Sequence, residues 1–102
     1  MARHQLKITC RNHTLHVNPD PLHMSPGDTV HLEAVGTDAT ITFLGLSPFV
    51  SGDRVIKVTP EKPIDATVAR LPPPPPISFP YKVDSDNPRC GSLAQGPEMI
   101  IP

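Results

Sequence analysis

The sequence is poor in aromatic residues and in stretches free of proline. Tryptophan is absent, tyrosine occurs once and phenylalanine three times among 102 residues, while proline occurs 15 times. Because proline is excluded from helix interiors and central strands, this content excludes a helical bundle and limits regular structure to short segments. A hydrophobic fraction of 37% argues against disorder. We therefore expect one small folded domain over residues 1–102.

The sequence also lacks a dominant charge and long apolar runs. Nine Lys and Arg against ten Asp and Glu give a net charge of −1. The sequence has no basic run of the kind that marks a nucleic-acid-binding surface, and no apolar run nears the roughly 20 residues that cross a bilayer. The first eight residues lack the apolar segment of a secretory signal. We expect a soluble, cytoplasmic protein that binds neither nucleic acid nor membranes.

Short segments of alternating apolar and polar residues recur about every ten residues, a pattern typical of an all-β sandwich or barrel. In one of them Val30, Leu32 and Ala34 share one face, and Ile56 with Val58 is the apolar choice in another. For residues 66–71 the pattern does not decide which face is inward. The predicted strands are residues 5–10, 14–17, 29–35, 40–44, 54–59, 66–71, 79–83 and 98–101.

Two proline-containing segments connect these strands. Residues 25–28, Ser-Pro-Gly-Asp, form the clearest predicted turn, since proline suits its second position and glycine tolerates a positive φ. Residues 72–76 are five consecutive prolines, which adopt polyproline II. We interpret this run as a stiff connection between two strands; the alternative is a ligand for an aromatic-lined groove.

The histidines are the candidate metal ligands, because zinc and copper favour imidazole. The candidates are His13, His16, His23 and His31, all within the first third of the chain. His16 and His31 face outward, and in the metal-site interpretation they pair across neighbouring strands while a bend near residues 11–13 brings His13 towards His16. The alternative is that all four are solvated surface residues.

The two cysteines, Cys10 and Cys90, leave two readings open. If they pair, the disulfide closes nearly the whole chain, whereas a cytoplasmic location would keep them reduced. Cys10 on a strand is expected to be a small core residue, and Cys90 between Arg89 and Gly91 an exposed thiol. No nucleophile with a local base and no glycine-rich phosphate loop occurs. We therefore expect that the protein is not an enzyme.

Two parts of the chain resemble the small cupredoxins. One is residues 15–32, in which an extended segment and a Pro-Gly-Asp-Thr-Val turn lead into an inner strand; the other is the pair of segments at residues 79–83 and 96–101, separated by a long loop. The resemblance implies a cupredoxin-like Greek-key β-sandwich of seven or eight strands.

The ligands of a type 1 copper site are missing from the matching positions. Copper-carrying cupredoxins use a histidine after the third strand, then cysteine, histidine and usually methionine near the last loop. Residues 36–43 contain no histidine, and Val83 stands where the cysteine would end its strand. A second register places Cys90 and Met99 at the family's positions, but Gln95 stands where histidine belongs. The resemblance therefore implies the fold without its copper and without another cofactor.

We expect a non-catalytic module that binds an unknown protein or small ligand. Its contact loops are expected to be residues 36–39, 45–52 and 84–96 at one end of the sandwich, with Leu46, Pro48 and Phe49 as contact residues. The alternative for Phe49 is that it plugs the end of the core. The alternative function is copper or zinc binding by the four histidines, with electron transfer as a role.

Overall fold

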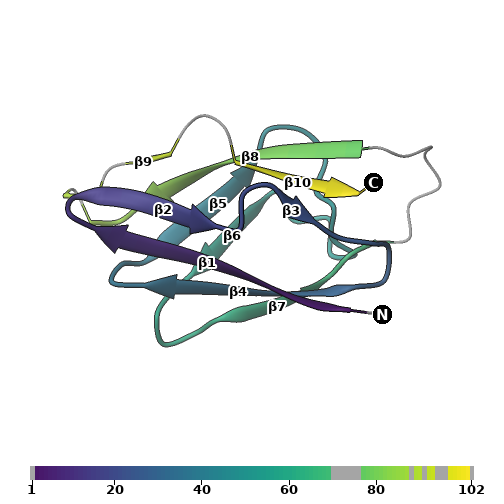
Figure 1. Ribbon diagram of the computed structural model, residues 1–102, viewed down its shortest axis with the longest axis horizontal. Helices are drawn as coiled ribbons and strands as arrows, with labels where there is room; N and C mark the ends of the chain where they lie inside the picture. Colours follow the sequence, from purple (N-terminus) through teal and green to yellow (C-terminus); the bar gives the residue numbers. More distant parts are fainter. Residues whose placement is uncertain (1, 70–76, 88, 91, 94–96, 102) are drawn as a thin grey trace.

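The computed structural model describes residues 2–69, 77–87, 89–90, 92–93 and 97–101. Over these residues the chain forms strands only, so none of them belongs to a helix that could cross a membrane (Figure 1). The ten strands are β1 Arg3–Arg11, β2 Thr14–Asn18, β3 Leu22–His23, β4 Thr29–Val35, β5 Ala39–Phe43, β6 Val55–Val58, β7 Ile64–Thr67, β8 Ile77–Ser85, β9 Ser92–Leu93 and β10 Glu98–Ile101.

The all-β class is confirmed, and the bounds of β4 and β10 are those predicted. The predicted number of seven or eight strands is too low for the described residues, because β3 and β9 are only two residues long and have no periodicity to detect. The strand predicted at residues 66–71 begins earlier, at Ile64, and turns Ile64 and Ala66 towards the core. Residues 70–71 and the predicted proline connection at 72–76 lie outside the described residues.

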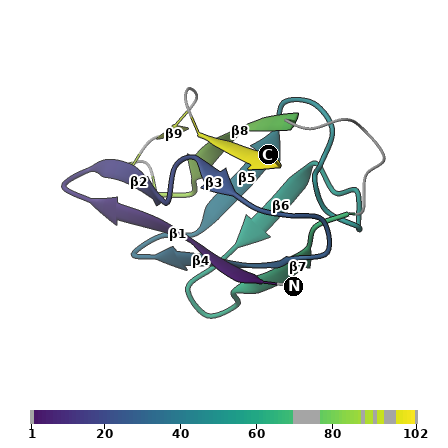
Figure 2. The same cartoon turned by 45° about the vertical axis from the view of Figure 1, so that its right-hand side comes forward.

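The strands form two sheets. One is four-stranded, in the order β2-β1-β4-β7; the larger one has the order β3-β10-β8-β5-β6, with β9 paired to β8 (Figure 2). Two pairings are parallel, β1 with β4 and β3 with β10, and the others are antiparallel. Parallel neighbours need long connections, so the chain changes sheet repeatedly, first between β2 and β3.

The two sheets share a core made by the alternating inward residues of both. Phe43 on β5 lies at its centre, in edge-to-face contact with Phe49 and with Tyr81, at 5.8 Å between ring centroids in each pair. Such contacts supplement the burial of apolar area. The predicted inward set is confirmed for β4, β5 and β6: Val30, Leu32, Ala34, Ile41, Phe43, Ile56 and Val58 are all buried.

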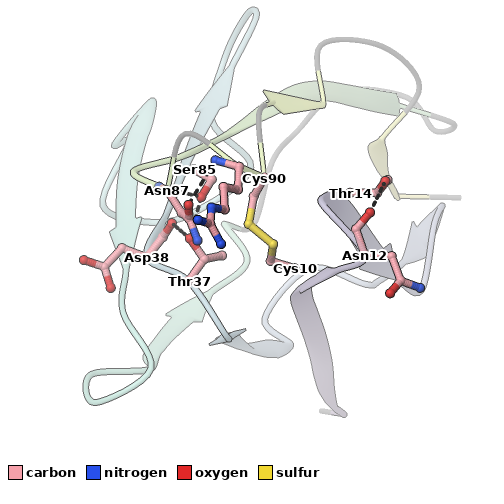
Figure 3. The surroundings of a disulfide bond; sticks show 9 residues. Cys10, Asn12, Thr14, Thr37, Asp38, Ser85, Asn87 and Cys90 are labelled. Atoms are coloured by element: carbon pink, nitrogen blue, oxygen red, sulfur yellow. Dashed lines mark hydrogen bonds between the residues drawn. A yellow bond between two sulfur atoms is a disulfide. The ribbon is translucent and has the colours of Figure 1, made fainter.

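A disulfide links the two sheets at the end that holds the β1–β2 turn (Figure 3). Cys10 lies on β1 of the four-stranded sheet and Cys90 follows β8 of the larger sheet, with 5.8 Å between their Cα atoms. Cys90 is only 4% exposed, so the expectation of an exposed thiol there is wrong. Gly36 passes close by with a φ of +80°, and a Cβ on it would lie 3.3 Å from the carbonyl oxygen of Cys10.

A buried carboxylate organises the opposite end of β1. The predicted turn at residues 25–28 is confirmed: the amide of Asp28 donates to the carbonyl of Ser25, at 3.0 Å, and Gly27 has a φ of 88°. The Asp28 carboxylate accepts hydrogen bonds from Nε2 of His4 at 2.7 Å and from the amides of Ala2 and Ser25 at 2.9 Å each. These three bonds, chiefly the one from His4, lower the pKa of Asp28 to about 2.

Removing the disulfide should cost much of the fold's stability. The two cysteines are 80 residues apart, and the chain-entropy relation gives about 4.5 kcal/mol for a loop of that length. We expect the double variant Cys10→Ala, Cys90→Ala to lose a free energy of unfolding of that order, measured by urea denaturation. Reduction of the unsubstituted protein serves as the control and should give a similar loss. A loss below about 1 kcal/mol in both would contradict the assignment.

Acid should destabilise the fold through Asp28. Because its pKa in the folded protein lies below the ordinary 3.8, the carboxylate stabilises the fold above about pH 4, and this contribution disappears as the pH falls towards 2. Asp28→Asn cannot ionise, so its stability should change less between pH 5 and pH 2 than that of the unsubstituted protein in thermal melts. Asp53→Asn, at an exposed carboxylate, is the control and should keep the unsubstituted pH profile. Identical profiles for Asp28→Asn and the unsubstituted protein would refute the role.

Candidate interaction surface

The connection between β5 and β6 carries most of the exposed apolar side chains. Among the described residues the large exposed hydrophobics are Leu44, Leu46, Val50, Val55 and, on β4, Val35. Four of these five belong to residues 44–55, and Leu46 and Val50 are 82% and 68% exposed. Single exposed apolar residues are ordinary, but a group on one short segment makes this connection a candidate interaction surface.

Backbone hydrogen bonds fix the conformation of the same connection. The amide of Val50 donates to the carbonyl of Thr67 and that of Ala69 to the carbonyl of Pro48, both at 2.8 Å. The amide of Gly52, whose φ is 74°, donates to the carbonyl of Phe49 at 2.9 Å. Phe49 thereby turns inward while its neighbour Val50 remains in solvent.

The three predicted contact residues lie in different environments. Leu46 is the most exposed of the large apolar residues described, whereas Pro48 is fully buried and Phe49 is 3% exposed against Phe43. Phe49 thus occupies the alternative position, plugging the end of the core. Leu46 alone among the three is free to touch a partner.

A groove lies between residues of β6 and β7, the outer strands of the two sheets. We call it the β6–β7 groove; it holds about 600 Å³ and is lined by Val50, Ser51, Asp53, Val55, Ile56, Lys57, Ile64, Asp65, Ala66 and Thr67. The exposed Val50 and Val55 therefore border the groove, and the half-buried Ile64 and Ala66 also line it. Its lining of apolar, polar and charged side chains suits a partly apolar ligand.

Charged side chains stand on either wall. On β7, Asp65 accepts a hydrogen bond from Nδ1 of His31 at 2.7 Å and pairs with Arg3 at 3.3 Å. The bond from His31 is the main reason that the pKa of Asp65 is lowered; burial opposes it and the charge of Arg3 adds to it. On β6, Lys57 pairs with Asp86 at 3.1 Å. Both ion pairs are exposed, so they orient the side chains more than they stabilise the fold.

The predicted contact loops do not gather at one end. β5 starts next to Ser85 of β8 and ends next to Tyr81, so residues 36–39 and the start of the 84–96 segment lie at the disulfide end. Residues 45–52 follow the other end of β5 and bond to residues 67–69 just after β7. The expected three-loop surface is therefore wrong, because connections before and after a single strand leave from its opposite ends.

The four candidate histidines are also dispersed. His13 lies at the tip of the β1–β2 turn, His16 on β2, His23 on β3 and His31 on β4. β1 separates β2 from β4, which places His16 and His31 about 10 Å apart across the sheet and about 14 Å along it, and their expected pairing is wrong. No group of three or more His, Cys, Asp or Glu positioned to hold a metal occurs within the described part of the chain.

The β6–β7 groove was missed by sequence reasoning, although one signal for it was present. The apolar choice of Ile56 and Val58 as the inward pair of β6 leaves Val55 outward, and Val55 is indeed exposed. That β7 provides the facing wall depends on the pairing of β4 with β7, which no local pattern encodes. Comparison with known proteins adds no guide: no protein-family model and no curated protein matches this chain.

Substitutions of Phe49 and of Leu46 should differ in their effect on the free energy of unfolding, because Phe49 belongs to the core and Leu46 to the surface. Phe49→Ala removes an aromatic ring that packs on Phe43, and we expect a loss of about 3–5 kcal/mol in the free energy of unfolding. Leu46→Ala removes an exposed side chain and should change it by less than about 0.5 kcal/mol. Urea denaturation measures both. Similar losses for the two variants would contradict the assignment of Phe49 to the core and Leu46 to the surface.

Proposed function

We propose that the protein is a non-catalytic, cupredoxin-like binding module that recognises an extended segment of a partner protein in the β6–β7 groove. The observation that carries this proposal is the position of Val50 and Val55, two well-exposed apolar residues at a groove between two strand edges. The partner segment would cover these valines and reach Ile64 between them.

The strand edges supply the second half of the recognition. β6 pairs with β5 and β7 with β4, and each is the last strand of its sheet among the described residues. The outer edge of such a strand presents backbone donors and acceptors to an incoming chain. An extended peptide satisfies these groups by adding a strand, while alternate side chains provide specificity. Lys57 and Asp65 on opposite walls would fix its register.

The cupredoxin-like part of the proposal is supported by the strand order. β1 lies between its hairpin partner β2 and the distant β4, and β10 lies between the neighbouring β8 and the distant β3. A Greek-key sandwich likewise places sequence-distant strands beside one another, although in it they are antiparallel and here both such pairings are parallel. A type 1 copper site is disfavoured because Cys90, the only cysteine near the family's ligand loop, is in a disulfide and offers no thiolate.

The non-catalytic part is supported by the surroundings of the two histidine–aspartate pairs. The Asp28 carboxylate otherwise accepts hydrogen bonds from the backbone amides of Ala2 and Ser25, and the Asp65 carboxylate otherwise accepts one from Arg3. Within the residues described, no hydroxyl or thiol joins either pair. A nucleophile activated by a base is therefore missing from both.

The disulfide bears on the compartment in which the module works. Reducing conditions in the cytoplasm open most disulfides, so a protein that relies on the Cys10–Cys90 bond is suited to an oxidising compartment. The proposal accordingly departs from the cytoplasmic location expected on the basis of the first eight residues.

Selection of peptides from a random library tests the proposed recognition. We expect selected peptides to alternate apolar and polar residues and to bind Val55→Glu at least tenfold more weakly than the unsubstituted protein in fluorescence anisotropy, because the glutamate places a charge against the apolar contact. Val35→Glu, which changes the exposed valine of β4 in the same way, should bind as the unsubstituted protein does.

Two outcomes would contradict the proposal. One is a selection that yields no binding peptide. The other is a set of peptides whose affinity is the same for Val55→Glu and for Val35→Glu.

A further inference from the structure

Positive charge is concentrated at the start of the chain although the whole chain is nearly neutral. The first 19 residues contain three of the nine Lys and Arg and none of the ten Asp and Glu. They also contain His4, His13 and His16. These residues form β1 and β2, so the uneven charge distribution becomes a feature of one hairpin.

The hairpin register brings polar and cationic side chains together on its outer face. Thr9 pairs with His16 and Arg11 with Thr14 in the antiparallel ladder of β1 and β2. Residues two apart in a strand share a face, so Lys7, Thr9 and Arg11 point outward together while Ile8 and Cys10 turn to the core. Thr9, Arg11 and His16 line a hollow of about 240 Å³ on this face.

The hollow lies on a rigid backbone. Asn12 and His13 form the two-residue turn that joins the strands, with φ values of 53° and 65°, which is the tight hairpin turn that matches strand twist. Cys10, between Thr9 and Arg11, is tied through its disulfide to the larger sheet. Fixed strands on both sides reduce the ordering that a ligand must impose when it binds.

Glu33 on β4 is the register partner of Lys7 and accepts a hydrogen bond from Gln5, but Arg11, at the hollow itself, has no carboxylate on either strand beside it in the ladder with β2. Arg3, the first residue of β1, forms an ion pair with Asp65, and Lys57 and Lys82 are also paired with carboxylates. Neither Lys7 nor Arg11 forms an ion pair with any residue that the structure describes. Around this hollow a guanidinium, a hydroxyl and an imidazole can each donate a hydrogen bond to the oxygen atoms of a tetrahedral oxyanion.

We propose that this outer face of the β1–β2 hairpin binds a phosphate or sulfate group, with Arg11, His16 and Thr9 as direct ligands. Lys7, two residues before Thr9 on the same face of β1, attracts the anion at long range and forms no direct bond to it. The site lies on the opposite edge of the four-stranded sheet from the β6–β7 groove, because β2 and β7 are that sheet's two outer strands. The proposal is therefore independent of the peptide recognition above.

An NMR titration with inorganic phosphate tests the site. We expect saturable shifts centred on the amides of Thr9, Arg11 and His16, with sodium chloride at matched ionic strength producing none. Arg11→Ala should weaken binding at least tenfold, and Arg11→Lys should restore only part of it because an ammonium lacks the planar fork. Arg11 is exposed, so both variants retain the fold.

The matched control is Lys62→Ala, which removes one positive charge from the turn between β6 and β7, away from the hairpin. It should leave phosphate binding unchanged. Equal weakening by Lys62→Ala and Arg11→Ala would show a general charge effect and overturn the proposal, as would shifts that rise without saturation. Parallel titrations with inorganic sulfate and phenyl phosphate distinguish a site for the free ion from one for an ester, the ester site binding phenyl phosphate more tightly.

Discussion

The structure depends most on the two sets of interactions that hold the two ends of β1 in place. At one end Cys10 is joined covalently to Cys90, and at the other the Asp28 carboxylate gathers His4 and two backbone amides. β1 also pairs with β2 on one side and with β4 on the other. β4 is parallel to β1, and between these two strands the chain forms β2 and then β3 of the larger sheet. This arrangement is therefore held by contacts between sequence-distant residues.

The two sets of interactions differ in their chemistry. The disulfide connects the two sheets irrespective of pH, whereas the Asp28 carboxylate acts only when it is ionised. Between them the inner faces of the two sheets meet, with Phe43 packed on Phe49 and Tyr81, and β6 and β7 each lie two places in sheet order from β8 and β1, which precede or carry the cysteines. The β6–β7 groove thus lies at the outer strands, away from both of these interactions, whereas the hairpin hollow lies beside the disulfide.

The alternation of apolar and polar residues was sufficient to predict strands that bury one face and expose the other. The alternation of Val30, Leu32 and Ala34 with polar residues predicted both the extent and the inward face of β4, and the Ser-Pro-Gly-Asp segment predicted the turn before it. β7 was misplaced because Ile64 and Ala66 alternate with polar residues just after a proline, and the sequence beyond them is equally apolar on both faces. Two-residue strands carry no period at all.

The alternation of residues along one strand does not show which other strands lie beside it in the sheet. The outward direction of His16 and His31 was predicted correctly for both strands, but the insertion of β1 between β2 and β4 keeps them apart. The same insertion places Thr9 beside His16 and so creates the hairpin hollow. Sheet order, set by contacts across the whole chain, thus removes one candidate site and forms another from overlapping residues.

The positions of the two surfaces have a consequence for how they work together. The hairpin face and the β6–β7 groove lie on opposite edges of one four-stranded sheet, three strand spacings or roughly 14 Å apart. A ligand on one edge leaves the other uncovered, so both can be occupied at once. The ladder from β2 through β1 and β4 to β7 is continuous and its middle strand is fastened at both ends. A packed sheet of this kind would hold the two proposed sites at a fixed separation, so ligands at both sites would require no change of shape.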